Sequence, residues 1–351
     1  MKKSEIIFSV LTAITIMNGT VSANASGDTN NEINTDMQFG GKTEIVTEQQ
    51  KSKGTKDNFY KLNEKIYFSQ NYDSNSQIYF MLQMTKQLDN TQNTTKETFV
   101  SHDAWLRENL GNGFSVRAGS LMYKMGEELW MDSDDMTAAD IEYNKNNTHA
   151  NIIIGKSDPS TSNSLTGINQ TYPISGGKVK IKAGSIGTDP EPIRIYHFEK
   201  IFGYDKLGLY AGRQGKNDYY GTYGTYYFTP KISLDSEISK NTTADAWAEK
   251  IGLRFGRPAK TERPGDMVYE LNYLRMDGGV YPDNSYTYYD KLYTTDSTGN
   301  YDGFIGLDCK ISYMLGDRTK LELEYGKGHP AIGSVKHETI GETILKLSTS
   351  F

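Results

Sequence analysis

The sequence predicts an all-β protein, a transmembrane antiparallel β-barrel of about 16 strands, within a range of roughly 14 to 18. Three observations lead to this prediction. Polar and apolar residues alternate in one segment after another, the polar faces of those segments carry many charges, and short turns alternate with long connections.

The N-terminal residues have the pattern of an export signal. A pair of lysines precedes an apolar stretch, Ile6 to Met17, and small residues follow up to Ala23 and Ala25. The stretch is shorter than the roughly 20 apolar residues that a membrane-spanning helix needs. We expect residues 1–23 to be a signal peptide, cleaved after Ala23 or Ala25, and residues 24–351 to form a single barrel domain.

The closing segment, "ILKLSTSF", shows the alternation plainly. Leu345, Leu347 and Phe351 share one face of a strand, whereas Lys346 and two serines share the other. Successive side chains of a strand point to opposite faces, so this segment has one apolar and one mostly polar face. A soluble sandwich would bury the apolar face, whereas a membrane barrel would turn it toward lipid.

Charges on the polar faces favour the barrel. The same alternation recurs in residues 247–255, 305–313 and 320–325, and their polar faces carry Lys, Arg, Asp and Glu. A protein core does not bury so many charges, but a water-filled lumen accommodates them. Weaker alternating segments near 166–174 and 178–184 would raise the strand count to about 18.

The connections alternate in length. A short turn, "LGDR", is followed by a long connection, "GKGHPAIGSVKHE", and a longer one spans 278–301. Outer-membrane barrels have short turns on the periplasmic side and long loops outside.

Composition excludes several other classes. The net charge of −6 argues against a nucleic-acid partner, and the single cysteine, Cys309, excludes an intramolecular disulfide. The five histidines have no metal-ligand spacing. Ser101, His102 and Asp103 would point to alternating strand faces, so they form no catalytic relay. We expect no enzymatic activity, no metal and no cofactor.

The stretch "DAWLRENLGNGFSVRAGSLMY", the export signal and the closing "ILKLSTSF" together resemble the Gram-negative outer-membrane porins. The resemblance implies a water-filled channel for passive diffusion of small hydrophilic solutes and ions across the bacterial outer membrane. It also implies a homotrimer, contacts with membrane lipid and lipopolysaccharide, and a barrel-assembly machinery that reads Phe351 as an assembly signal. The alternative is an outer-membrane barrel that acts as an adhesin or structural protein through long external loops, such as the tyrosine-rich 278–303.

An acidic segment, Met125 to Met136, follows the expected fifth strand. In porins the loop after that strand folds inward and narrows the pore, whereas the alternative is a solvated surface loop. Leu129, Trp130 and Met131 favour the inward position, because they are apolar. We expect a pore constriction with these acidic residues: Glu127, Glu128, Asp132, Asp134 and Asp135.

Basic residues on polar strand faces are expected to oppose that acidic segment across the lumen. A transverse field between them would orient dipolar solutes and set ion preference. The expected basic residues of the pore wall are Arg107, Arg117, Lys178, Lys180, Lys182, Arg194, Lys250, Arg254 and Lys310.

Overall fold

The computed structural model describes residues 37–52, 55–71, 73–87, 97–127, 129–157, 170–174, 177–181, 191–258, 262–281, 289, 292, 294–295, 301–331 and 339–351. The expected signal peptide lies outside these residues. In the described part of the chain, no helix is long and apolar enough to cross a membrane.

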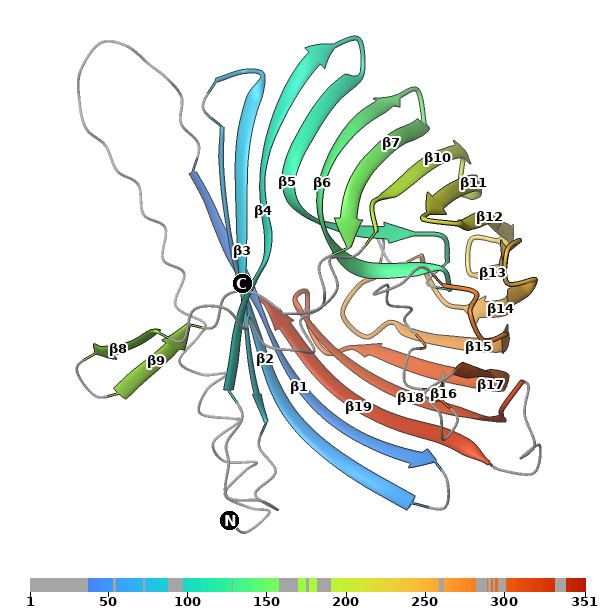
Figure 1. The fold of residues 1–351 in the computed structure, drawn as a ribbon. Helices are drawn as coiled ribbons and strands as arrows, with labels where there is room; N and C mark the ends of the chain where they lie inside the picture. Colours follow the sequence, from blue (N-terminus) through green and yellow to red (C-terminus); the bar gives the residue numbers. More distant parts are fainter. Residues whose placement is uncertain are drawn as a thin grey trace.

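Sixteen antiparallel strands form one closed barrel (Figure 1). The ring closes where the last strand pairs with the first, Ser350 opposite Lys42. Beyond that pair, Gly41 and Phe351 exchange two backbone hydrogen bonds of 3.0 and 3.1 Å. The strands are β1 (Met37–Ser52), β2 (Thr55–Asn71), β3 (Ser76–Gln87), β4 (Glu97–Gly111), β5 (Phe114–Met125), β6 (Met131–Lys145), β7 (Thr148–Ser157), β10 (Ile193–Phe202), β11 (Asp205–Gln214), β12 (Asn217–Thr229), β13 (Ile232–Asn241), β14 (Ala246–Phe255), β15 (Met267–Met276), β17 (Tyr301–Met314), β18 (Thr319–His329) and β19 (Ile340–Ser350).

The predicted strand number of 16 is confirmed. The weaker segments near 166–174 and 178–184 are not wall strands. They contain β8 (Gln170–Ile174) and β9 (Gly177–Ile181), which pair with each other and, among the described residues, with no barrel strand. The wall is continuous without them, because β7 pairs directly with β10. A two-residue strand, β16 (Thr294–Thr295), pairs with β17.

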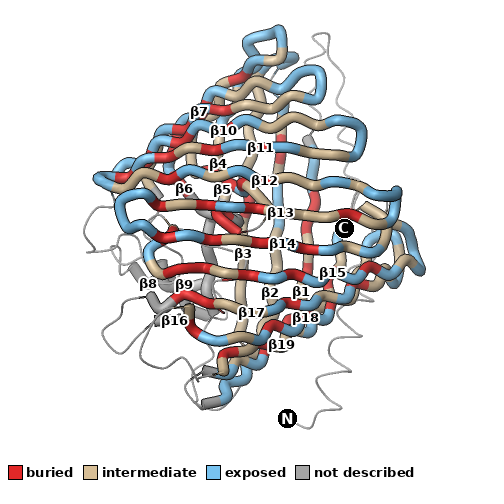
Figure 2. Tube along the Cα trace, turned by 90° about the vertical axis from the view of Figure 1, so that its right-hand side faces the viewer, coloured by how far each residue is buried: buried red, intermediate tan, exposed pale blue. Residues whose placement is uncertain are grey.

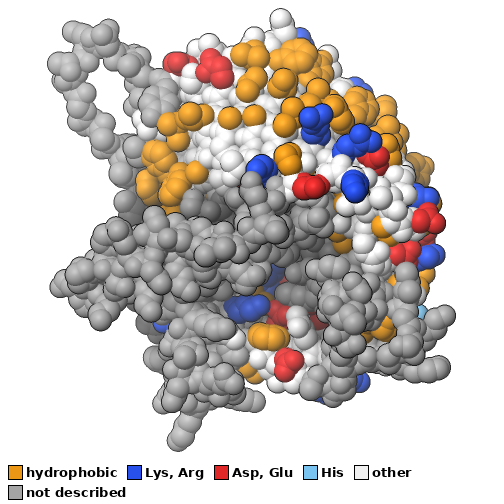
Figure 3. Space-filling view, viewed as in Figure 1, with side chains coloured by type: hydrophobic (Ala, Val, Ile, Leu, Met, Phe, Trp, Pro, Cys, Tyr) orange, Lys and Arg blue, Asp and Glu red, His pale blue; other side chains and the backbone are white. Residues whose placement is uncertain are grey.

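Alternation along each strand separates an outer face from an inner one, and on β14 the outer face is apolar. On β14, Trp247, Ile251 and Leu253 are 36–55% exposed, whereas Lys250 between them is only 5% exposed. Figure 2 shows this alternation of buried and exposed positions along the strands. Hydrophobic side chains accordingly gather on the outer surface, as the upper part of Figure 3 shows.

The two ends of the barrel differ. At one end, called the turn end, β1 begins, β19 ends, and most connections are short: 72–75, 112–113, 146–147, 203–204, 230–231 and 315–318, with a longer one at 256–266. The opposite end, called the loop end, carries the long connections 88–96, 158–192, 277–300 and 330–339, together with shorter turns. The predicted alternation of connection lengths is therefore present along most of the chain.

Candidate functional site

Residues 121–135 leave the barrel wall and turn into its interior. The ladder between β4 and β5 ends at the pair Ala104–Ser120, and the ladder between β6 and β7 begins only at Met136–Ser157. Between these points β5 and β6 pair with each other, and in the described residues no ladder joins them to another strand. In Figure 1 the end of β5 and the start of β6 bend away from the wall. We call residues 121–135 the inner hairpin.

Local features explain where the inner hairpin departs. Gly119 has a φ of 142°, and a Cβ built there would lie 2.2 Å from the Ala104 carbonyl oxygen. Glycine therefore permits a close approach and a backbone turn that other residues resist. The Met122 N–H then donates to the Asp103 carboxylate at 2.7 Å, which replaces a lost ladder partner.

One buried carboxylate holds the tip of the inner hairpin. Glu237, on the inner face of β13, is 0% exposed. Its Oε2 accepts the N–H groups of Glu127 at 2.6 Å and Leu129 at 3.1 Å, and its Oε1 accepts that of Trp130 at 3.0 Å. The Tyr210 hydroxyl donates to Oε1 at 3.0 Å. Four hydrogen bonds to one buried carboxyl group therefore fasten the tip to the wall.

Glu127 is held by three other strands. Its carboxylate is paired with Lys206 of β11 at 2.5 Å and accepts the Thr225 hydroxyl of β12 at 3.2 Å. Lys250 of β14 donates to the Glu127 carbonyl at 2.7 Å. The Glu127 side chain is therefore turned toward the wall and neutralised there.

Trp130 is the apolar anchor of the inner hairpin. Its ring is 0% exposed and stacks on Tyr210, with centroids 4.2 Å apart and planes 9° apart. Tyr210 pairs with Gly221 of β12, where a Cβ would lie 2.1 Å from its ring. The glycine lets the Tyr210 ring lie flat on the wall, so that it presents its face to the indole.

Apolar residues of the inner hairpin fill the space between it and the nearby wall. The wall strands concerned are β7 and β10 to β13, which we call the docking half. The buried residues of this cluster are Leu121, Tyr123, Met125, Trp130, Met131, Met136 and Ala138 from β5, β6 and the tip, and Ile153, Ile193, Ile195, Tyr210, Tyr219 and Tyr223 from the docking half.

Part of the tyrosine-rich connection 277–300 also lies inside the barrel. Val280, Tyr289 and Leu292 are at most 1% exposed and pack in one cluster with Leu129 of the inner hairpin. Leu292 sits over Gly326 of β18, where a Cβ would lie 2.9 Å from it. These described residues of the connection therefore fill the interior at the loop end instead of projecting outward.

The strands opposite the docking half have a charged inner face. Glu322 of β18 lies 2.9 Å from Lys346, 3.4 Å from Lys320 and 3.8 Å from Lys310. Glu44 of β1 continues this surface with its own lysine pair. We call β17, β18, β19, β1 and β2 the charged half.

The structure places two predicted arginines beside acids that the sequence analysis did not name. Arg117 is paired with Asp140 at 2.7 Å, and Arg107 with Glu142 at 3.0 Å. Both acids belong to β6, and Asp140 also accepts the Tyr123 hydroxyl at 2.9 Å. The partners of both arginines are thus on β6, which is adjacent to the strand of Arg117 and one strand further from that of Arg107.

The other predicted basic residues do not share one location. Lys250, Arg254 and Lys310 lie on inner faces, and Arg254 pairs with Glu262 and Glu270. Lys178 and Lys180 belong to β9, which is not a wall strand. The side chains of Lys178 and Lys180, all of Lys182 and Glu128, and the side chains of Asp132, Asp134 and Asp135 lie outside the described residues.

Arg194 lies on the opposite face from the one predicted. It is exposed and shares its face of β10 with Tyr196 and Phe198, which are 53% and 44% exposed. Ile193 and Ile195 are 0% exposed and face inward. The prediction assumed that the apolar face of a strand is the outer one. On β10 the inner face is apolar too, because it packs against the inner hairpin, and Arg194 belongs to the outer face.

Sequence reasoning missed the residues that hold the tip. Glu237, Lys206 and Tyr210 are far from the acidic segment in sequence, and only the closed barrel brings them to it. The sequence does carry a weak signal for Glu237. It alternates with apolar residues and shares a strand face with Ser233 and Ser239, which indicates that it points into the barrel. Among the described residues, no group of three or more His, Cys, Asp or Glu is arranged to hold a metal ion.

Comparison with solved structures finds bacterial porins. OmpF of Salmonella typhi has a TM-score of 0.58 at 8% identity, covering 90% of this chain and 97% of that one. OprB of Pseudomonas putida has a TM-score of 0.58 at 10% identity, covering 90% and 94%. A mutant of the Rhodopseudomonas blastica porin has a TM-score of 0.52 at 10% identity, covering 90% and 100%.

No protein-family model and no curated protein sequence matches the chain. At 8–10% identity the likeness to these structures concerns the fold. The chain therefore has the porin fold, a closed barrel of 16 antiparallel strands.

Proposed function

We propose that the protein is an outer-membrane channel for passive diffusion of small hydrophilic solutes and ions. The observation that carries the proposal is the inner hairpin, fastened inside a closed barrel by Glu237. A polypeptide segment held across the interior narrows the passage and leaves the rest to water. The fold it shares with OmpF and OprB supports the same role.

The free passage in this proposal runs along the charged half. The docking half is packed with apolar side chains, so ions have no hydrated path between it and the inner hairpin. The lysines around Glu322 and the carboxylates beside them face the remaining space. Solutes would therefore meet charges of both signs at short range.

The acidic residues of the inner hairpin keep their proposed role in ion preference. Glu127 is neutralised by Lys206, so the remaining negative field would come from Glu128, Asp132, Asp134 and Asp135. Replacing the five carboxylates together with amides is expected to shift the reversal potential toward anions in a salt gradient. An unchanged reversal potential would mean that residues of the barrel wall, and not these carboxylates, set the ion preference.

The adhesin alternative receives less support. Its argument rested on a tyrosine-rich loop reaching outward, yet Val280, Tyr289 and Leu292 are buried inside the barrel. We propose that this connection covers part of the mouth and narrows it further.

Planar-bilayer recording tests the channel proposal directly. The purified protein is expected to give discrete conductance steps. A variant in which residues 121–135 are replaced by a two-residue turn between Ser120 and Met136 is expected to give larger steps. These two residues lie at the base of the inner hairpin, where β5 and β6 are already paired, so the ladder outside the excision is kept. A protein that is folded but does not conduct would overturn the proposal.

We also propose that Phe351 acts as an assembly signal and that the barrel forms homotrimers. Phe351 is 46% exposed, and its ring packs over Gly41 at the seam between β19 and β1. Phe351→Ser is expected to reduce the amount of folded protein in the membrane more than it changes single-channel conductance. Normal membrane levels would contradict the signal role, and crosslinking in mild detergent that yields monomers would contradict the trimer.

A further inference from the structure

Three aromatic residues lie on neighbouring strands of the barrel wall: Tyr67 of β2, Tyr79 of β3 and Trp105 of β4 (Figure 1). The rings of Tyr67 and Tyr79 have centroids 6.3 Å apart and planes 17° apart. Those of Tyr79 and Trp105 have centroids 5.1 Å apart and planes 14° apart. The three rings therefore form one stack, which we call the aromatic row.

Strand parity turns the aromatic row toward the lumen. Ile66, Phe80 and Leu106 are its neighbours in sequence, and they are 36–61% exposed on the outer surface. Successive side chains of a strand point to opposite faces, so the aromatic row points inward. At one end of the row, the guanidinium of Arg117 lies over the ring of Trp105, 5.5 Å from its centroid.

Tyr67 forms the other end of the aromatic row, and that end is open. Tyr67 is opposite Gly40 of β1, where a Cβ atom would overlap the Tyr67 hydroxyl group. The glycine thus lets the tip of the Tyr67 ring extend over β1. Tyr67 remains 36% exposed although it is on the inner face, so part of its ring is open to the lumen.

The docking half shows what a tyrosine in such a position can bind. Tyr210 also lies over a glycine, Gly221, and it stacks with the indole of Trp130 with planes 9° apart. Among the described residues, the ring stacked on Tyr67 is that of Tyr79. Tyr67 therefore offers a solute the kind of place that Trp130 fills on Tyr210. Offset stacking stabilises an aromatic pair beyond the burial of apolar area, so an aromatic ring fits this place better than a saturated one.

The charge beside Tyr67 is positive. Lys65 lies two residues from Tyr67 on the same face of β2, which is about 7 Å along a strand. Lys42 is opposite Lys65 and pairs with Glu44 at 2.6 Å, whereas Lys65 has no ion pair in the described part of the chain. An ammonium group attracts an anion and repels a cation. The solute that fits best therefore carries a negative group on its aromatic ring.

We propose that Tyr67 and Lys65 form a binding site for aromatic carboxylates. The ring of the solute stacks on the open part of Tyr67 and continues the aromatic row, and its carboxylate pairs with the Lys65 ammonium group. Because β2 belongs to the charged half, the site borders the passage of the proposed channel. Its role in transport rests on the proposed function, but binding itself requires only the folded barrel.

The test titrates benzoate into the intact protein in neutral detergent and follows binding by saturation-transfer NMR, which needs no current. Cyclohexanecarboxylate is the matched ligand, because it has the same charge but no flat aromatic face. The wild type is expected to bind benzoate about fivefold more tightly than cyclohexanecarboxylate.

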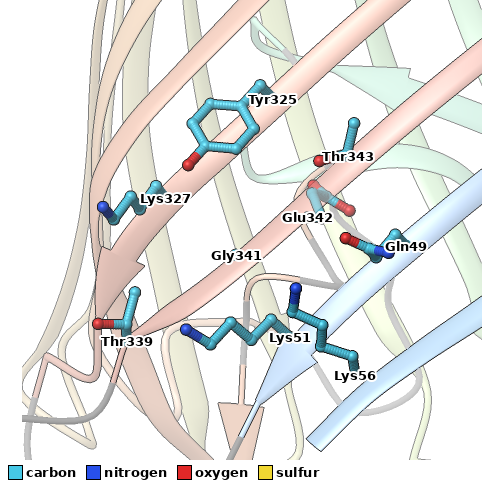
Figure 4. Close-up of a pocket in the computed structure, with 9 residues that line it drawn as sticks. All are labelled: Gln49, Lys51, Lys56, Tyr325, Lys327, Thr339, Gly341, Glu342 and Thr343. Carbon is cyan, nitrogen blue, oxygen red and sulfur yellow. The ribbon is translucent and has the colours of Figure 1, made fainter. Parts of the chain in front are cut away.

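Substitutions separate the two parts of the site. Tyr67→Leu is expected to bind benzoate as weakly as the wild type binds cyclohexanecarboxylate, whereas Tyr67→Phe keeps the ring and should bind as the wild type does. Lys65→Gln is expected to lose the preference for benzoate over uncharged benzyl alcohol. The control, Lys56→Gln/Tyr60→Leu, changes the same residue types on the outer face of β2, where Lys56 lines a separate surface pocket (Figure 4). It should bind benzoate as the wild type does.

Several results would overturn the proposal: equal binding of benzoate and cyclohexanecarboxylate, equal weakening by Tyr67→Leu and by the control, or an unchanged preference in Lys65→Gln. Displacement of benzoate by an equal concentration of glucose would also overturn it and assign the site to sugars. Conductance without benzoate binding would contradict this inference alone, whereas benzoate binding by a folded protein that does not conduct would contradict the proposed function alone. Circular dichroism shows whether each variant keeps its β-sheet.

Discussion

The two halves of the inner wall differ in what they face. In the docking half, Ile153, Ile193 and Ile195 are 0% exposed and pack against the inner hairpin. In the charged half, Glu322 lies among three lysines within 3.8 Å. Both halves are built from the same kind of strand, so the difference comes from what covers them. The inner face of the docking half is mostly apolar where the inner hairpin covers it, and its polar residues, such as Glu237, bind the tip of the hairpin.

The largest expected effect concerns Trp130, the apolar anchor that holds the inner hairpin against the docking half. Trp130→Ala removes a fully buried indole and is expected to cost about 3–5 kcal/mol, as large core truncations do. Thermal unfolding in detergent measures this loss. Trp247→Ala is the matched control, because Trp247 is 36% exposed on the outer face of β14. Equal losses from both variants would mean that the docking half contributes no special stability.

The second effect concerns the carboxylate that holds the tip. Glu237→Gln puts an amide NH₂ where an acceptor oxygen stood, so at least one of the backbone N–H groups of Glu127, Leu129 and Trp130 loses its partner. Leaving a buried N–H donor without a partner is expected to cost about 1–3 kcal/mol.

Hydrogen exchange at those tip amides measures the local loosening. Glu324→Gln, on the inner face of β18, is the control and should leave the tip amides protected. Protection that survives in Glu237→Gln would show that Trp130 stacking alone holds the inner hairpin.

The third effect tests the charged half as the path of ions. Glu322→Gln removes the carboxylate among Lys310, Lys320 and Lys346, so the reversal potential is expected to shift toward anions. Lys346→Gln is expected to shift it the other way. Stability is also expected to fall in Glu322→Gln, because Glu322 is only 7% exposed and its three lysines lose the carboxylate that they share. If neither substitution moves the reversal potential, ions do not pass along this wall.

The smallest effect tests the orientation of β10. Arg194→Gln is expected to leave the reversal potential unchanged and stability within about 0.5 kcal/mol, because Arg194 is exposed on the outer face. Lys310→Gln, on an inner face, should shift ion preference toward cations. A shift of similar size in Arg194→Gln would place Arg194 in the lumen.

The amino-acid sequence determined the strand alternation, the closed barrel and the placement of the acidic segment after the fifth strand. These depend on local periodicity and turn chemistry, which each segment carries by itself. Leu345 and Leu347 outside, and Lys346 inside, follow from parity alone. The sequence also placed Lys250, Arg254 and Lys310 on inner faces.

Only the tertiary structure decided which inner faces are dry and what holds the inner hairpin. Parity separates the two faces of β10, but both are apolar, so only the docked hairpin shows that Ile193 points inward and Arg194 outward. The same holds for the tip: Glu237 lies 107–110 residues from the N–H groups it binds. Contacts at that separation depend on barrel closure, which brings β13 opposite β5 and β6, and no local pattern records them.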